Sequence, residues 1–239
     1  MPKRCLIIGA SGEIGIQTTE LLAAEGYAVA VHYHKNQQRI MELKQRISSQ
    51  QWLGAYQGDL STATGLDALI GKLPLDFDAI VFAQGNHSNH LLQDMSASEM
   101  DKMYFVHVKS VWLITHHLLP SMISNKSGEI VVVSSVWGEE GASTEVVYSS
   151  VKGAQISFVK GLAKETAPSN IRVNAVTPGL IATKMNDHLA AEDLDSLESE
   201  IPLGRSGMGS EVAQAILFLL SKRSSYITGH ILRVNGGWY

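Results

Sequence analysis

Three residues in the middle of the chain have types and a spacing that suit the reduction of a carbonyl group. Tyr148 and Lys152 are four residues apart in a stretch with helical periodicity, so they share one helix face. A lysine ammonium one turn from a tyrosine favours the tyrosinate and lowers the pKa of the phenol, which brings a general acid closer to neutral pH. Ser135 ends an apolar run upstream, and its hydroxyl can hold a substrate carbonyl. We predict proton transfer to a carbonyl oxygen, with the hydride supplied by a cofactor.

Short apolar runs alternate with helical patterns along the chain, and this order predicts the frame that positions these side chains. The predicted strands are Cys5–Ile8, Ala28–Tyr33, Trp52–Gln57, Ala79–Ala83, Ile130–Ser134, Ile171–Ala175 and Ile231–Val234. The predicted helices are Ile14–Gly26, Ile40–Ile47, Leu66–Leu73, Met100–Met122, Val147–Ala167 and Val212–Leu220. Such alternation indicates parallel strands with crossover helices on both faces. We predict an α/β fold: a single Rossmann-type, doubly wound domain over residues 1–239 with a seven-stranded parallel sheet, and a substrate lid at about 180–203.

Composition narrows the class of partner and the compartment. The 239 residues carry a formal net charge of −4, which gives no reason to expect nucleic acid or an anionic membrane as partner. No apolar run approaches the roughly 20 residues of a membrane span, so we predict a cytoplasmic protein. The single cysteine, Cys5, lies in an apolar run and is predicted to be a buried hydrophobic residue. His87 with His90, and His116 with His117, lack a third ligand at a suitable spacing, so we predict no metal site.

A glycine-rich turn directly after the first strand predicts a dinucleotide site. Glycine at these positions permits a tight turn, close approach of the backbone to phosphate, and close packing of helix and strand. The helix that follows offers free N–H groups and a positive dipole end to a pyrophosphate. The predicted phosphate-binding residues are Gly9, Ser11, Gly12, Glu13, Ile14 and Gly15. A glycine-rich turn without a ligand is the alternative.

The end of the second strand bears on the choice between NADP and NAD. An acidic residue there would bind the ribose of NAD and repel a 2′-phosphate, but no acidic residue occurs between Glu25 and Glu42. His34 and Lys35 follow this strand and could meet a phosphate, although Lys35 could instead be an exposed surface lysine. We therefore predict NADP(H) as the cofactor rather than NAD(H).

A further cofactor contact is predicted after the third strand, at Asp59 and Leu60. Asp59 either accepts a hydrogen bond from the adenine amine or caps the next helix, a role for which Ser61 and Thr62 compete.

Taken in order, these motifs resemble those of the short-chain dehydrogenase/reductase family, and the likeness covers nearly all of the chain. The matching pieces are Gly9–Gly15, Asp59, Ser135, Tyr148, Lys152, Asn174–Gly179, Thr183–Met185, Pro202–Arg205, Tyr226–Gly229 and Val234–Gly237. The resemblance implies that Tyr148 is the acid, that Lys152 binds the nicotinamide ribose, and that Ser135 polarises the carbonyl. It also implies cofactor contacts at Ala83, Gly85, Pro178, Gly179, Ile181 and Thr183. A non-catalytic NADP-binding protein is the alternative of another class, and the intact catalytic residues argue against it.

Three positions depart from the pattern of that family. Glu13 stands where its usual central glycine would be, and the fourth strand ends in Phe82-Ala83-Gln84-Gly85 where the family typically reads Asn-Asn-Ala-Gly. His107 stands at the usual helix asparagine, which supports a water that relays protons to the lysine. A neutral histidine can donate and accept, so His107 either takes over this relay as a catalytic residue or is fixed by local packing.

Two groups within the family fit the sequence. The 3-oxoacyl-acyl-carrier-protein reductases imply acyl carrier protein as partner; Lys126 stands where one of their docking residues is expected, whereas Ser169 replaces the other. In detail the chain resembles the elongation factor P 5-aminopentanone reductases, which reduce a lysine-linked ketone with a cationic tail. That likeness rests on Ser134–Gly138, Gly141–Ser143, Glu145–Tyr148, Val151–Gln155, His107 and Asn235–Tyr239. Resemblance to the family also implies a homotetramer.

Acidic residues near the catalytic motif suit a cationic substrate. They are Glu139, Glu140, Glu145, Asp187, Glu192, Asp193, Asp195, Glu198 and Glu200. An acidic rim attracts an amine and repels a phosphopantetheine carrier, although a solvated helix face is the alternative for the later ones. We predict that Trp137 and Glu145 contact the substrate, and that one of these carboxylates binds its amine.

Overall fold

Seven parallel strands form one sheet in the order β3-β2-β1-β4-β5-β6-β7. The computed structural model describes residues 2–183 and 191–239. The strands are β1 (Arg4–Ile8), β2 (Ala28–Tyr33), β3 (Trp52–Gln57), β4 (Ala79–Phe82), β5 (Gly128–Val133), β6 (Ile171–Pro178) and β7 (Ile231–Val234). The strand order reverses direction between β1 and β4, which creates a crevice at their carboxyl ends where ligands bind in folds of this kind. The predicted doubly wound, single-domain fold is confirmed.

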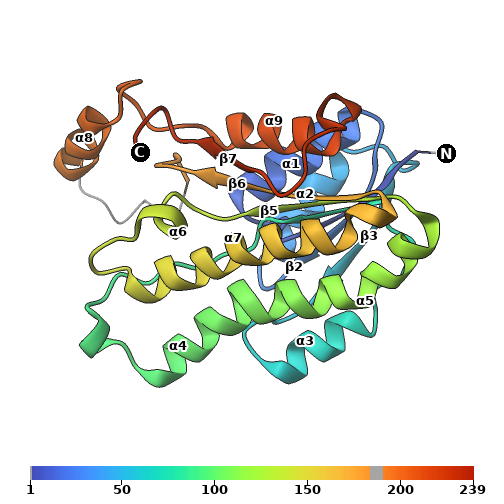
Figure 1. Cartoon of the computed structure of the whole chain (residues 1–239), viewed down its shortest axis with the longest axis horizontal. Coiled ribbons are helices and arrows are strands. Elements are labelled where there is room, and N and C mark those ends of the chain that lie inside the picture. The colour runs from blue at the N-terminus through green and yellow to red at the C-terminus, as the bar shows by residue number, and fades with distance from the viewer. Residues whose placement is uncertain (1, 184–190) are drawn as a thin grey trace.

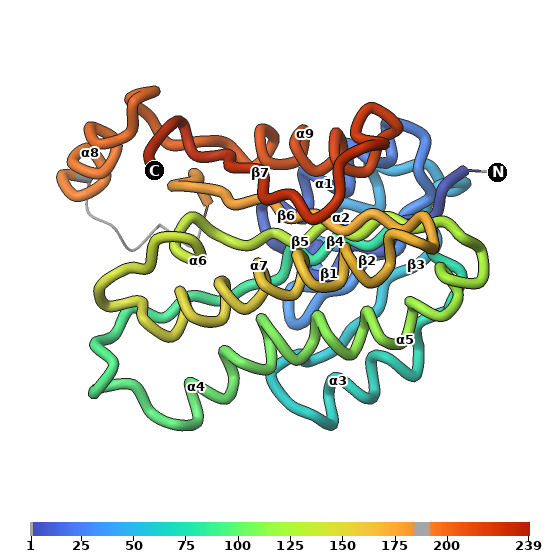
Figure 2. The backbone as a smooth tube through the Cα atoms, in the orientation of Figure 1, coloured from blue at the N-terminus to red at the C-terminus, as the bar shows by residue number. Residues whose placement is uncertain are grey.

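Helices cover both faces of the sheet (Figure 1). One face carries α1 (Glu13–Ala24), α2 (Gln37–Gln45) and α9 (Gly209–Leu220), and the other carries α3 (Ala63–Ile70), α4 (Ala97–Tyr104), α5 (Ser110–Asn125) and α7 (Val146–Thr166). Two short helices, α6 (Trp137–Glu140) and α8 (Ala191–Glu200), lie at one end of the molecule, close to the end of the chain (Figure 2). That end is also where β5 and β6 finish.

Alternation along each strand divides the core into two hydrophobic layers. In β1, Cys5 and Ile7 pack with α1, α2 and α9, whereas Leu6 and Ile8 pack with α3, α5 and α7. Strands that are buried on both faces read as continuous apolar runs, which is why β1 and β4 were recognisable in the sequence. Cys5 is fully buried, as predicted.

The predicted helix Met100–Met122 is wrong in one respect, because the structure divides it. A π-helical turn, η2 (Phe105–Lys109), separates α4 from α5, and the N–H of Ser110 bonds the carbonyl of Phe105 rather than that of a residue four positions back. One extra residue inside an apolar helical stretch is difficult to distinguish from a continuous helix in the sequence. β6 also runs three residues further than predicted, because the polar residue Thr177, which is buried, hides its continuation.

The predicted substrate lid at 180–203 lies partly outside the described residues, as do Lys184, Met185 and Asp187, which were singled out in the sequence. Its described parts are residues 180–183 and 191–203, which include α8. Across the described residues, no helix has the length and apolar character needed to cross a membrane.

Candidate active site

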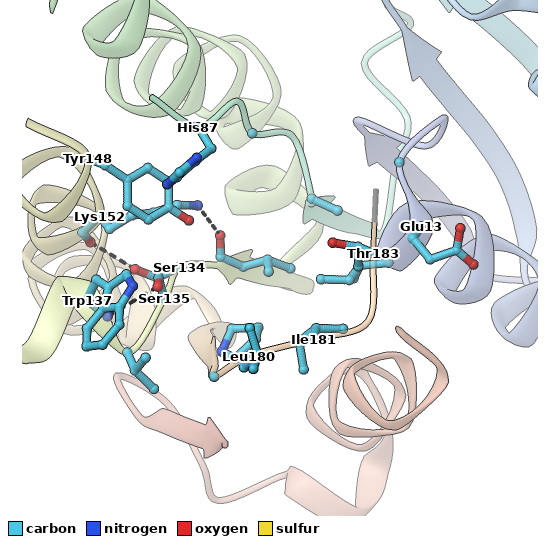
Figure 3. Close-up of a pocket in the computed structure, with 18 of the residues that line it drawn as sticks. Glu13, His87, Ser134, Ser135, Trp137, Tyr148, Lys152, Leu180, Ile181 and Thr183 are labelled. Carbon is cyan, nitrogen blue, oxygen red and sulfur yellow. Dashed lines mark hydrogen bonds between the residues drawn. The ribbon is translucent and has the colours of Figure 1, made fainter. Parts of the chain in front are cut away.

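A cavity of about 450 Å³ opens at the carboxyl ends of β4, β5 and β6. Its lining includes the predicted residues Gly12, Glu13, Ile14, Ala83, Gly85, Ser135, Trp137, Glu145, Tyr148, Lys152, Pro178, Gly179, Ile181 and Thr183. The close-up in Figure 3 shows two separate ends: Tyr148, Lys152, Ser135 and His87 gather on one side, and Glu13 lies across the cavity beyond Thr183. The sheet topology therefore brings together most of the residues singled out in the sequence, and they form one site with two ends.

Tyr148 and Lys152 project from the first two turns of α7, as their spacing predicts. The Lys152 Nζ donates to the Val133 carbonyl at 2.9 Å and lies 5.6 Å from the centre of the Tyr148 ring. Both side chains are buried. Because Val133 is the last residue of β5, this hydrogen bond ties the catalytic helix to the strand that delivers Ser135.

Ser135 follows β5 and is held between that strand and α6. Its Oγ accepts from the Trp137 N–H at 3.2 Å, while the neighbouring Ser134 Oγ donates to the Lys152 carbonyl at 2.9 Å. Gly138 permits the close approach of α6 to α7, since a Cβ there would lie 2.8 Å from the Lys152 backbone carbon. The serine hydroxyl and the phenol therefore share the same end of the cavity.

Burial dominates the electrostatics of this pair. It raises the pKa of Tyr148 above its ordinary range, to which the Glu145 charge also contributes, while a hydrogen bond with Ser135 acts in the opposite direction. Burial lowers the pKa of Lys152 to about 7. The Tyr–Lys spacing predicted a lowered pKa for Tyr148, but the structure gives the opposite direction. Removing the phenolate from water outweighs the attraction of Lys152, because Lys152 has a pKa of about 7 and is only partly charged at neutral pH.

His107 is fully buried in the π-helical turn, and the centre of its ring lies 5.7 Å from the centre of the Tyr148 ring, with the two rings nearly perpendicular. Its Nε2 lies 3.0 Å from the Asn86 carbonyl and 2.9 Å from the Asn86 Oδ1. Burial, followed by the Lys152 charge, lowers its pKa well below the ordinary value, so the ring is neutral. Nε2 also lies 3.4 Å from the Asn86 N–H, whereas Nδ1 is buried and has no hydrogen-bond partner among the described residues. The predicted proton relay stays a prediction.

Gln155 was given no role of its own in the sequence analysis. It lies one turn beyond Lys152 on α7, is buried, and its Nε2 donates to the His107 carbonyl at 2.8 Å. This hydrogen bond fixes α7 against the π-helical turn. Its only sequence signal is an amide at a helix position whose neighbours are apolar.

His87 and Glu145 form a pair in the wall of the cavity. The His87 Nε2 lies 2.9 Å from the Glu145 Oε1, and each side chain is 17% exposed. The His87 ring stands edge-on to Tyr148 at 5.7 Å, and the two rings adjoin in Figure 3. Sequence reasoning considered His87 only as a metal ligand, whereas its contact is with the carboxylate. Among the residues described, no group of three His, Cys, Asp or Glu side chains could hold a metal ion.

Three of the other predicted carboxylates, Glu139, Glu140 and Glu198, have partners outside the cavity. Glu139 and Glu140 lie 3.0 and 3.4 Å from Arg233, and Glu198 accepts from the Ser206 N–H. Within the described part of the chain, Glu145 is the member of the acidic set that lines the cavity. Its Oε2 is buried and has no hydrogen-bond partner among the described residues.

At the opposite end, backbone rather than side chains shapes the loop after β1. A Cβ on Gly9 would lie 2.5 Å from the Gln84 Cα, and one on Gly15 would lie 2.4 Å from the Gly9 carbonyl oxygen. The N-cap of α1 is Gly12, which has no side chain to bind the first N–H groups of the helix. Arg39, which sequence reasoning missed, joins this end: it lines the cavity and contacts both Ser11 and Glu13.

Seven residues predicted to bind the cofactor do not line the cavity: Gly9, Ser11, Gly15, His34, Lys35, Asp59 and Leu60. The His34 Nε2 lies 3.8 Å from Asp59. Asp59 accepts from the N–H and the Oγ of Ser61, and Thr62 is the N-cap of α3. The helix-cap role therefore belongs to Thr62, and Leu60 is part of the core.

Comparison with known proteins gives the family of this chain. Residues 9–239 match the family model described as Enoyl-(Acyl carrier protein) reductase. The "Uncharacterized oxidoreductase YmfI" of Bacillus subtilis (strain 168) is 48% identical, covering all of both chains. The 3-oxoacyl-[acyl-carrier-protein] reductase FabG of Thermotoga maritima is 36% identical over 98% of this chain and 97% of its own length. The chain belongs to the short-chain dehydrogenase/reductase family. It is therefore an oxidoreductase.

A solved structure allows a comparison in three dimensions. The structure titled "ElxO with NADP Bound" superposes with a TM-score of 0.86 and is 29% identical, covering all of this chain and 99% of its own. Within this family, the present chain keeps a loop that fits a dinucleotide pyrophosphate. Gly9 and Gly15 allow the tight packing that a Cβ would prevent, and the uncapped end of α1 opens into the cavity.

Proposed function

We propose that this short-chain dehydrogenase/reductase uses NADPH to reduce a ketone that carries a cationic amine, with the aminopentanone group of elongation factor P as its substrate. The observation that supports the cationic tail is the carboxylate of Glu145, which lies beside Tyr148 in the cavity wall. A family-level ketoreductase would need the catalytic residues alone; the carboxylate is an additional feature that selects among ketones.

The residues have separate roles in this proposal. Bound NADPH supplies the hydride. Tyr148 donates a proton to the carbonyl oxygen, and Ser135 holds that oxygen through its Oγ. Lys152 binds the ribose, and its pKa of about 7 lets it exchange a proton near neutral pH. The glycine loop and the first turn of α1 hold the pyrophosphate.

Glu145 suits an ammonium group because one of its two carboxylate oxygens lacks a hydrogen-bond partner within the described part of the chain. Its Oε1 is paired with His87, but its Oε2 is buried without a partner among the described residues. A buried carboxylate oxygen without a hydrogen bond is costly, and an ammonium donor relieves that cost. The neighbouring Trp137 offers an aromatic wall for the alkyl chain or the cation, since it lines the same cavity.

A 3-oxoacyl group on acyl carrier protein is the second candidate. It is favoured by relatives named 3-oxoacyl-[acyl-carrier-protein] reductase at 33% and 36% identity. Glu145 opposes it, because a carboxylate beside the reacting carbon offers nothing to an uncharged acyl chain and repels an anionic carrier.

Turnover of two substrates tests the proposal: an acetoacetyl thioester and an aminoketone with an ammonium tail, in the wild type and in Glu145→Gln. We expect the wild type to prefer the aminoketone. Glu145→Gln should lower kcat/KM for the aminoketone by roughly 30-fold or more while changing the thioester far less. The ratio between the substrates is the readout, because Glu145 also affects the pKa of Tyr148 and that effect is common to both.

Glu140→Gln is the matched control, since Glu140 is a half-exposed carboxylate that pairs with Arg233 outside the cavity. It should leave the ratio unchanged. Faster turnover of the thioester by the wild type, together with an unaltered ratio in Glu145→Gln, would assign the chain to the second candidate.

A further inference from the structure

An ion pair bridges the two helices that border the nucleotide end of the cavity. The Arg39 Nη2 donates to the Glu13 Oε2 at 2.8 Å, and its Nη1 donates to the Ser11 carbonyl at 2.9 Å. Glu13 is the first residue of α1, Arg39 is near the start of α2, and both line the cavity. The side chains are 31% and 23% exposed, so the pair is partly desolvated.

Arg39 is well placed to meet a phosphate on the ribose. Among the described residues that line the cavity, the lysine and arginine side chains are Arg39 and Lys152. Lys152 is committed to Val133 at the chemical end. A guanidinium is a planar fork that matches phosphate geometry and is always charged. His34 and Lys35, the residues that sequence reasoning chose for the 2′-phosphate, lie outside the lining.

Glu13 already accepts a hydrogen bond from Nη2, one of the two terminal nitrogens of the Arg39 guanidinium. Its carboxylate lies in the first turn of α1, where the helix dipole stabilises a negative charge. The guanidinium that would attract a cofactor phosphate is thus already paired with a carboxylate of the protein. A 2′-phosphate that approaches Arg39 must therefore compete with Glu13 for the charge of the guanidinium and for one of its Nη2 hydrogens.

We propose that Glu13 is an intramolecular competitor of the 2′-phosphate for Arg39, so that this ion pair sets how strongly the protein prefers NADPH to NADH. Arg39 provides the preference, and Glu13 reduces it by stabilising the cofactor-free state. After displacement, the Glu13 carboxylate keeps a neighbour in Gln17, whose Nε2 lies 3.5 Å from Oε1. NADH has no group to exchange for Glu13 and therefore leaves the pair intact.

Dissociation constants of NADPH and NADH, measured by the change in nucleotide fluorescence, test this without turnover. Glu13→Gln should lower the dissociation constant of NADPH several-fold, up to about tenfold, and leave that of NADH nearly unchanged. Arg39→Gln should raise the dissociation constant of NADPH by about tenfold or more, with little effect on that of NADH. In Arg39→Gln, the added Glu13→Gln change should no longer separate the two cofactors. Adenosine 2′,5′-bisphosphate against adenosine 5′-monophosphate repeats the test with the 2′-phosphate as the difference.

A second ion pair between the same helical regions provides the control. The Arg46 Nε lies 2.8 Å from the Glu20 Oε1, and neither residue lines the cavity. Glu20→Gln should therefore leave both dissociation constants unchanged. Arg39→Lys, which keeps the charge, separates loss of phosphate binding from misfolding if Arg39→Gln is unstable.

Two results would overturn the proposal. If Glu13→Gln weakens both cofactors, Glu13 is a ligand of the cofactor and not its competitor. If Glu13→Gln lowers the dissociation constant of NADH as much as that of NADPH, the carboxylate acts on the pyrophosphate that both cofactors share. Glu13 and the 2′-phosphate then do not compete for Arg39.

Discussion

The two ends of the cavity are built from different materials. At the nucleotide end, the shape comes from main chain: glycines at 9, 12 and 15, and the N-terminus of α1. The ion pair there is partly exposed. At the carbonyl end, the shape comes from buried side chains whose protonation is altered by their surroundings, namely Tyr148, Lys152 and His107.

This difference separates two kinds of dependence on sequence. The backbone end depends on the absence of side chains, so adding a Cβ is the damaging change. The buried end depends on specific functional groups held out of water, so deleting a single oxygen or charge is the damaging change. Substitutions at the nucleotide end should therefore change stability and cofactor binding. Substitutions at the carbonyl end should change the reaction rate and the dependence on pH.

The largest expected effect is at the carbonyl end. Tyr148→Phe removes the proton donor and keeps the ring packing against His87 and His107. We expect kcat to fall by about a thousandfold, within the usual range for general acid catalysis, with the NADPH dissociation constant unchanged. Single-turnover rates and a fluorescence titration measure the two quantities. Retention of more than a tenth of the wild-type rate would show that another group donates the proton.

At the nucleotide end, a matched pair of glycines distinguishes packing from ligand contact. Gly15→Ala should lower the free energy of unfolding by about 3 kcal/mol, because its Cβ would lie 2.4 Å from the Gly9 carbonyl oxygen. Gly12→Ala should cost little stability, since its nearest contact is 3.4 Å. Gly12 lines the cavity, however, so its Cβ should weaken dinucleotide binding. Urea unfolding and cofactor titration of both variants provide the comparison, and equal stabilities would contradict it.

The smallest expected effect is a pH dependence of the free energy of unfolding, which arises from Lys152 at the carbonyl end. The folded pKa of Lys152, about 7, lies below its ordinary value of 10.5. The unfolded chain therefore binds more protons between these values, and the free energy of unfolding should rise with pH from 7 to 9, by at most about 1.4 kcal/mol per pH unit. The window ends at 9, because above it the buried Cys5 thiol, with its raised pKa, acts in the opposite direction.

Lys152→Met should flatten this dependence, whereas Lys160→Met, an exposed position on the same helix, should not. Urea unfolding at three pH values within the window gives the slope. An identical slope in Lys152→Met and the wild type would mean that Lys152 keeps its ordinary pKa in the folded protein.

Sequence reasoning found what depends on short-range spacing. The strand–helix alternation gave the sheet, and the spacing of Tyr148 and Lys152 placed both in the cavity. It missed Arg39 and His87, because their partners lie 26 and 58 residues away and the contacts form only in the tertiary fold. It also gave the wrong direction for the Tyr148 pKa, because desolvation depends on the whole surrounding core and is invisible in a four-residue motif.

The π-helical turn at Phe105–Lys109 has a consequence for the tolerance of insertions and deletions. Each residue advances a helix by about 100°, so the extra residue in this turn sets the rotational phase between two packing faces. Before it, Met103 of α4 packs beside Tyr148 and Val151; after it, Val111 and Ile114 of α5 pack into the core under the sheet. Deleting one residue here would restore a continuous helix and turn one of those faces toward solvent. Chains that share this site should therefore keep the length of this segment unchanged even where its side chains vary.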